Sequence, residues 1–164
     1  MNENRETLEA ALTAALSSAM ENMAFEQVDI PCAGMPGPEI EERNLWAVLP
    51  ILRPAAGEIA IRISEDYVKT LTTSLFEGSD KLVSDELTKD ALAEILNTIA
   101  GCLMARLVSP MQEFELGLPK VTIGESHLDR TGHITYDFDI GGHLVSAFVL
   151  GITAQVNTNT KTDK

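Results

Sequence analysis

Positive charge is scarce in this sequence, which has 12 lysines and arginines against 25 aspartates and glutamates and a net charge of −13. Such a chain repels phosphate backbones and anionic lipid surfaces, so we expect neither nucleic acid nor a membrane as a partner. Long apolar runs are lacking too, since no stretch approaches the roughly 18 apolar residues of a membrane-spanning helix. Residues 1–20 lack the basic start and continuous apolar run of a signal peptide, so we expect a cytoplasmic protein.

Metal-binding side chains are also few. The two cysteines, Cys32 and Cys102, have no C-x-x-C neighbour, and the three histidines, His127, His133 and His143, are scattered. His133 and His143 begin two strands of a predicted hairpin and could face one another, but no carboxylate stands at ligand spacing, so we interpret them as surface residues. We expect no metal site, and we interpret both cysteines as ordinary thiols in a reducing compartment.

What is present suits a single globular domain, because 164 residues with 45% apolar composition can enclose a core without disulfides or metals. We expect one domain over residues 1–154 and a polar C-terminal tail over 155–164. Hydrophobic periodicity predicts the elements within it. The expected helices span 3–23, 65–77 and 85–107, and the expected strands span 25–30, 45–52, 57–64, 114–118, 120–123, 133–139 and 143–152.

The order of these elements predicts an α+β fold, with helices packed on a largely antiparallel sheet. Strands 45–52 and 57–64 form one expected hairpin, and the strands on either side of Gly141-Gly142 form another. The second strand of the first hairpin alternates apolar and polar residues, so one face should be buried and the other at least partly wet. Pro50 indicates an edge or a bulge at its position, and residues 31–42, rich in proline and glycine, are expected to form a loop.

One face of the helix predicted over 85–107 carries the strongest functional signal. Asp90, Glu94, Asn97 and Gly101 follow one another at steps of four, three and four residues, so they share a face. On spacing alone, such residues are ordinarily a solvated helix surface. Asparagine is a poor helix former, however, and its place in mid-helix favours a functional reason.

The spacing and its context resemble the signature of a known family. Asp90-x3-Glu94-x2-Asn97 is followed by Pro119 after 21 intervening residues, and the strings AEILNTIAG and LGLPKVTIG surround these positions. This pattern resembles the CheC/CheX/FliY family of phosphatases that act on the chemotaxis response regulator CheY. The resemblance extends from about residue 45 to 152 and includes the first helix. A single Glu-x-x-Asn helix is similar to the CheX members, which are dimers with one active helix per subunit.

The resemblance implies a CheC/CheX-like fold and hydrolysis of the aspartyl phosphate of a response regulator in two-component signalling. Asn97 would orient the attacking water, and Glu94 would pair with a lysine of the regulator. Asp90 would supplement the docking surface, and Gly101 would permit close approach. The resemblance also implies a homodimer joined through sheet edges, no cofactor of its own, and Mg²⁺ supplied by the partner regulator.

Two alternatives stay open from the sequence. The same acidic helix face could belong to a non-catalytic module that binds a response regulator or a flagellar switch component. A small-molecule enzyme is less well supported, because the sequence offers no recognisable nucleophile, metal set or phosphate loop. Gly141-Gly142 opens a strand and is interpreted as a turn, and Trp46 and Phe148 are interpreted as core residues.

Overall fold

A computed structural model of the protein describes residues 2–24, 28–29, 43–75, 83–125 and 128–152. The helices in this part are α1 (Asn2–Ala24), α2 (Glu65–Leu75) and α3 (Asp85–Leu107). The strands are β1 (Val28–Asp29), β2 (Asn44–Arg53), β3 (Gly57–Ser64), β4 (Glu115–Leu116), β5 (Lys120–Ile123), β6 (Ile134–Ile140) and β7 (His143–Leu150). The expected loop at 31–42, Cys32 and the expected tail at 155–164 lie outside the described residues.

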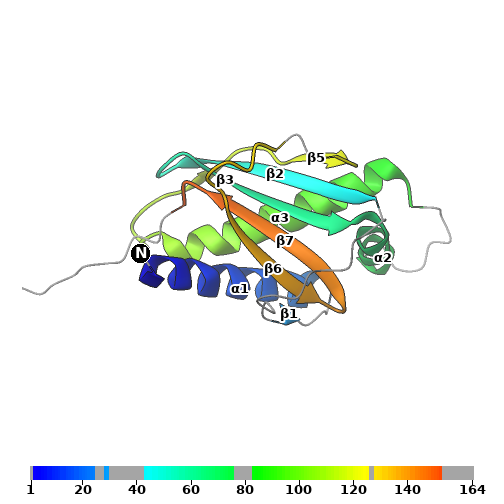
Figure 1. Ribbon diagram of the computed structural model, residues 1–164, viewed down its shortest axis with the longest axis horizontal. Helices are drawn as coiled ribbons and strands as arrows, with labels where there is room; N and C mark the ends of the chain where they lie inside the picture. Colours follow the sequence, from blue (N-terminus) through cyan, green and yellow to red (C-terminus); the bar gives the residue numbers. More distant parts are fainter. Residues whose placement is uncertain (1, 25–27, 30–42, 76–82, 126–127, 153–164) are drawn as a thin grey trace, which may run out of the picture.

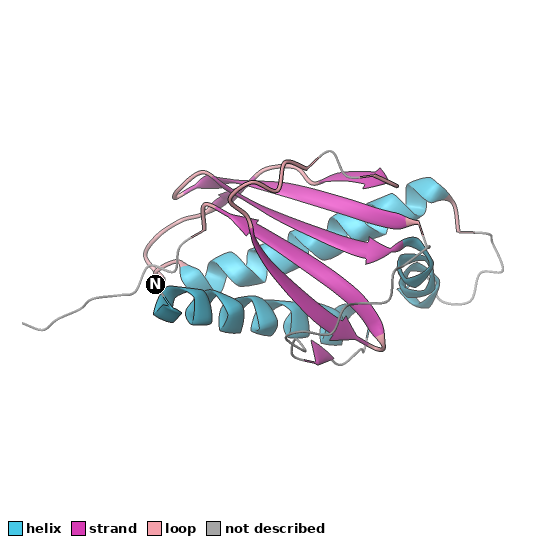
Figure 2. Ribbon diagram, viewed as in Figure 1, coloured by secondary structure: helices cyan, strands magenta, loops and turns pink. Residues whose placement is uncertain are grey.

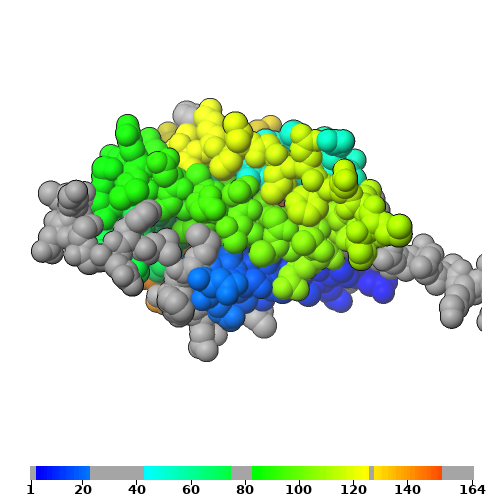
Figure 3. All heavy atoms as spheres, turned by 180° about the vertical axis from the view of Figure 1, so that it is seen from behind, coloured from blue at the N-terminus to red at the C-terminus, as the bar shows by residue number. Residues whose placement is uncertain are grey.

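The strands form one antiparallel sheet in the order β1-β6-β7-β3-β2-β4, and β5 also pairs with β2. The long helices α1 and α3 lie side by side across one face of this sheet (Figure 1), and they are seen in front when the molecule is viewed from behind (Figure 3). The α+β prediction is therefore confirmed. Both predicted hairpins are present, β2–β3 and β6–β7.

The turn of the second hairpin follows directly from its two glycines. Gly141 and Gly142 adopt positive φ angles of 59° and 84°, a conformation that residues with a Cβ rarely adopt. The Asp139 carboxylate accepts a hydrogen bond from the Gly142 N–H at 2.8 Å and closes the turn. The glycine pair is thus a turn, as the sequence predicts.

Pro50 lies at a break in the edge of the sheet. On the side away from β3, strand β5 pairs with Leu45–Val48, and β4 pairs with Ile51 and, after a register shift, Arg53. The Pro50 carbonyl accepts a hydrogen bond from the Gly117 N–H at 2.7 Å in the gap between these two short strands. Because proline has no N–H to donate, the break falls where a continuous ladder would lack a bond.

The main core lies between the sheet and the helices. From β3 it takes Ile59, Ile61 and Ile63, which all point toward the helices. An apolar stripe on α3 faces them, and α1 closes the same core. The helical core residues include Leu92, Leu96, Ile99 and Leu103 of α3 with Leu8, Leu12 and Leu16 of α1. The Leu87 N–H donates to the Ser84 hydroxyl at 3.2 Å, so Ser84 caps the N-terminus of α3.

The outer face of the sheet is partly wet at Glu58 and Arg62, as the alternation predicts, but one part of it is covered. Ala60 is fully buried there, and with Trp46 and Phe148 it forms a second apolar cluster. The segment between β5 and β6 passes over this face (Figure 2) and packs Leu128 against the cluster. A connection that crosses the sheet cannot be seen in the pattern of one strand, so the alternation did not predict this cover. Trp46 and Phe148 are core residues, as predicted.

The interpretation of His133 and His143 as surface residues is confirmed for His143 and wrong for His133. The two histidines also do not face one another. They lie at opposite ends of the β6–β7 hairpin, because residue 143 pairs with residue 140. The His133 side chain is 1% exposed, and its Nε2 lies 3.0 Å from a carboxylate oxygen of Glu58. His143 is exposed and stacks on Tyr67, with 4.1 Å between ring centroids.

Candidate functional site

Helix α3 presents the predicted residues on its solvent face. Its apolar stripe is buried against the sheet and α1, which fixes the rotation of the helix and turns the opposite side outward. Asp90, Glu94 and Asn97 are all exposed, and Gly101 is half-buried. The structure therefore brings the four residues to one accessible face, as the spacing predicts. Helix α3 lies on the outside of the molecule in the view from behind (Figure 3).

The polar side chains on this face are not used by the fold. In the part of the chain that the structure describes, no hydrogen bond or ion pair involves the side chain of Asp90, Glu94 or Asn97. Removing these side chains would therefore cost the core nothing. A carboxylate and a carboxamide one helical turn apart are held rigidly by α3 and remain free to contact another molecule.

The glycine at the end of the face is not required by packing. A Cβ added at Gly101 would meet no atom within 4 Å outside its own helix neighbourhood. Glycine in a helix interior costs about 1 kcal/mol relative to alanine. The fold thus carries a destabilising residue at a position where packing does not require glycine. As a result, no side chain projects from the helix at Gly101.

A second segment lies beside α3 on the same side of the molecule (Figure 3), since β5 packs against the helix. Pro119, the signature proline, immediately precedes β5. Two apolar side chains in the connection between α3 and β5 are strongly exposed, Met111 at 97% and Leu118 at 88%. Sequence reasoning did not single them out, because the exposure of a lone apolar residue in a connection has no periodic signal.

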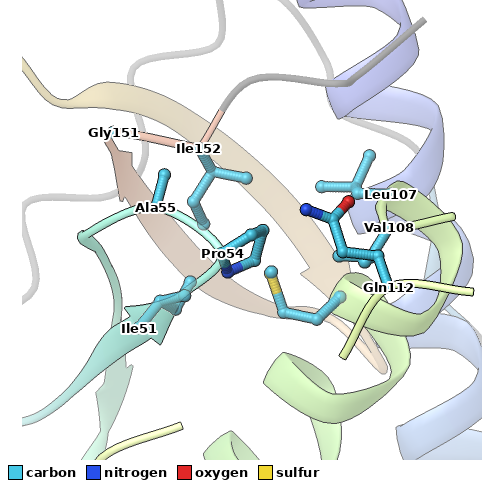
Figure 4. A pocket seen from close by; sticks show the side chains of 9 residues that line it. Ile51, Pro54, Ala55, Leu107, Val108, Gln112, Gly151 and Ile152 are labelled. Atoms are coloured by element: carbon cyan, nitrogen blue, oxygen red, sulfur yellow. The ribbon is translucent and has the colours of Figure 1, made fainter. Parts of the chain in front are cut away.

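A small apolar hollow lies at the other end of α3 (Figure 4), between Ile51, Pro54, Met104, Leu107 and Ile152. Its volume is about 30 Å³, which leaves room for only a few water molecules at most. It is therefore too small to be a substrate pocket. It is also lined by none of the four residues on the α3 face.

The described residues hold no group of three or more histidine, cysteine, aspartate or glutamate side chains placed to bind a metal ion. Among the same residues, no helix is long and apolar enough to cross a membrane. The α3 face carries polar groups that can orient or attract another molecule.

The fold and this helix face match one class of protein. A family model described as the chemotaxis phosphatase CheX matches residues 47–139. The chain belongs to the CheX family of chemotaxis phosphatases, which confirms the resemblance seen in the sequence. No match was found to an individually curated protein sequence.

Solved structures share the fold. The chemotaxis protein CheX from Vibrio vulnificus matches with a TM-score of 0.67 and 18% identity, over 86% of this chain and 93% of that one. CheX from Desulfovibrio desulfuricans matches with a TM-score of 0.67 and 20% identity, over 87% and 98%. A CheX-CheY-BeF3-Mg²⁺ complex from Borrelia burgdorferi matches with a TM-score of 0.62 and 18% identity, over 86% and 95%.

Proposed function

We propose that this protein hydrolyses the aspartyl phosphate of a CheY-like response regulator in chemotaxis or related two-component signalling. The observation that carries the proposal is the placement of Glu94 and Asn97. Both are exposed and without a partner among the described residues, on one face of α3 in a member of the CheX family.

The chemistry of the substrate explains why so few groups suffice. An aspartyl phosphate is a mixed anhydride, and its hydrolysis needs a water in line with the leaving carboxylate and stabilisation of charge on the phosphoryl oxygens. We expect the regulator to provide Mg²⁺ and a lysine for that charge. The Borrelia burgdorferi complex, which contains CheX, CheY and Mg²⁺, supports this division of labour. The phosphatase then has to add a positioned water.

Asn97 has the properties that this task requires. A carboxamide both donates and accepts hydrogen bonds, so it can hold a water in a defined orientation. It is also neutral, whereas a carboxylate at the same place would repel the phosphoryl oxygens. Glu94, one turn earlier, would pair with the regulator's lysine and set the register of the two proteins. Asp90 would extend the acidic docking surface.

We further propose a cytoplasmic homodimer joined through sheet edges, with one active helix per subunit. The sheet ends at β1 on one side and at the short strands β4 and β5 on the other. Exposed strand edges offer unpaired backbone groups that a second copy can satisfy. Sedimentation at micromolar concentration tests this, and a clean monomer would refute it.

The alternative is a non-catalytic module that binds a response regulator or a flagellar switch component through the same face. The two functions differ in turnover alone. Phosphate release from a phosphorylated CheY-like receiver domain should rise well above its spontaneous rate when the protein is present in substoichiometric amounts. Binding without faster release would establish the alternative. Screening each receiver domain of the source organism would identify the substrate.

Gly101 provides a test of close approach on the same face. Gly101→Ala should raise the free energy of unfolding by about 0.5–1 kcal/mol, because it removes the glycine penalty and meets no neighbour. Gly101→Gln should stabilise the helix similarly but should weaken binding to the regulator several-fold, since its side chain fills the low surface. Thermal unfolding and titration with the regulator measure the two effects. Unchanged affinity in the glutamine variant would show that the space is not used.

A further inference from the structure

A broad hollow lies on the outer face of the sheet, opposite the helices. Its volume is about 530 Å³, within the range of small-molecule sites. It lies between the sheet and the segment that follows β5. The polar and aromatic side chains around it include Arg43, Asn44, Trp46, Arg62, Glu125 and Arg130.

Strand register places Arg62 in the floor of the hollow. Asp137, Ser146, Arg62 and Trp46 are successive partners across β6, β7, β3 and β2, so their side chains share the outer face. The Arg62 guanidinium donates to the Ser146 hydroxyl at 3.0 Å and lies 5.9 Å from the centre of the Trp46 ring. The Ser146 hydroxyl in turn donates to the Asp137 carboxylate at 2.6 Å. Arg62 is thus held in place by a neutral hydroxyl and a ring.

The other two arginines are also incompletely neutralised. Arg43 pairs with Glu65 at 3.2 Å, but the same carboxylate pairs with Lys69 at 2.8 Å, so one negative charge serves two cations. Arg130 is exposed. Within the described ranges, neither Arg62 nor Arg130 has an ion-pair partner within 4.0 Å. One carboxylate, that of Glu125, lines the hollow.

This concentration of positive charge stands out against the rest of the chain. Three of the six arginines in a sequence of net charge −13 converge on one concave surface from distant positions. Elsewhere the acidic surface would repel an anion, so only local positive charge can hold one. Guanidinium groups offer planar pairs of donors that match phosphate oxygens.

We propose that the hollow binds a small phosphate-bearing molecule. The arginines would contact the phosphate oxygens, and the Asn44 amide and the rim of Trp46 would contact the rest of the ligand. The site lies on the opposite face of the sheet from α3, so it is separate from the proposed phosphatase surface and adds a second binding function.

Trp46 is the single tryptophan of the sequence, and its fluorescence reports directly on the hollow. Inorganic pyrophosphate, titrated at constant ionic strength without Mg²⁺, should produce a saturable change in wild-type emission. Arg130→Gln should weaken binding about tenfold, because it removes one charge-assisted contact. The matched control, Arg53→Gln, removes the same charge from an exposed arginine that pairs with Glu115 away from the hollow. It should bind pyrophosphate like the wild type.

Several results would overturn the proposal. They are an absence of any saturable response to pyrophosphate, equal weakening by Arg130→Gln and Arg53→Gln, and citrate binding as tightly as pyrophosphate. The Asn97→Ala variant should keep full pyrophosphate affinity, since Asn97 lies on the other side of the sheet. Loss of affinity in that variant would place the anion elsewhere and refute the site.

Discussion

Replacing Asn97 with alanine is expected to abolish the stimulated dephosphorylation of the response regulator, with a rate loss of about 100-fold or more. That is the scale measured when one preorganised hydrogen-bonding group is removed from an enzyme site. In the proposed mechanism the carboxamide is the one group that this chain contributes to the attacking water. Without it, the regulator should return to its spontaneous rate. Single-turnover phosphate release at saturating phosphatase measures the effect on the chemical step.

The fold should survive this change, which makes the result interpretable. Asn97 is exposed and makes no side-chain hydrogen bond to the described residues, and alanine is a better helix former than asparagine. Unfolding should therefore occur at the same temperature or slightly higher. Asn97→Asp is a close control for size: it should also be inactive, because its charge repels the phosphoryl group. Undiminished release in Asn97→Ala would reject the mechanism.

Glu94→Ala should act mainly on engagement with the regulator. Loss of one partner of a charge pair that becomes buried on binding costs about 2–5 kcal/mol, so affinity should fall at least tenfold. The rate at saturating regulator should change much less, because Asn97 remains in place. Titration of the phosphorylated regulator separates the two, as a raised KM with a nearly constant kcat.

Asp90→Ala provides the matched control for Glu94. Asp90 is also an exposed carboxylate on α3, one turn earlier, so the variant removes the same charge from the same helix face. Its effect should be smaller and should fade as salt is added, as expected of a peripheral charge. Equal affinity of wild type and Glu94→Ala would remove the proposed pairing with lysine. Equal losses in both variants would indicate a general attraction between surfaces.

The α3 face was predictable because it is local. Positions 90, 94, 97 and 101 belong to one helix, so the helical period alone brings them together, and the apolar stripe alone tells which side is buried. The same holds for β3, whose observed bounds equal the predicted ones, and for the turn at Gly141-Gly142. The roles of Glu94 and Asn97 came from the family signature, and they remain for the variants to test.

What the sequence alone could not supply depends on contacts between distant segments. The cover on the outer face results from the packing of Leu128, which lies between β5 and β6 in the sequence, against the sheet, and the burial of His133 beside Glu58 results from the pairing of β3 with β7. The basic hollow needs Arg43, Arg62 and Arg130, which no local period relates.

The sequence by itself therefore determined the elements, the hairpins and the composition of the α3 face, because backbone periodicity and turn chemistry act over a few residues. The tertiary structure decided which faces are covered and where scattered charges meet. Those outcomes depend on strand order and register, which bring together residues that are dozens of positions apart. One surface of this protein could thus be inferred from a single helix, and the other appears only after the chain has folded.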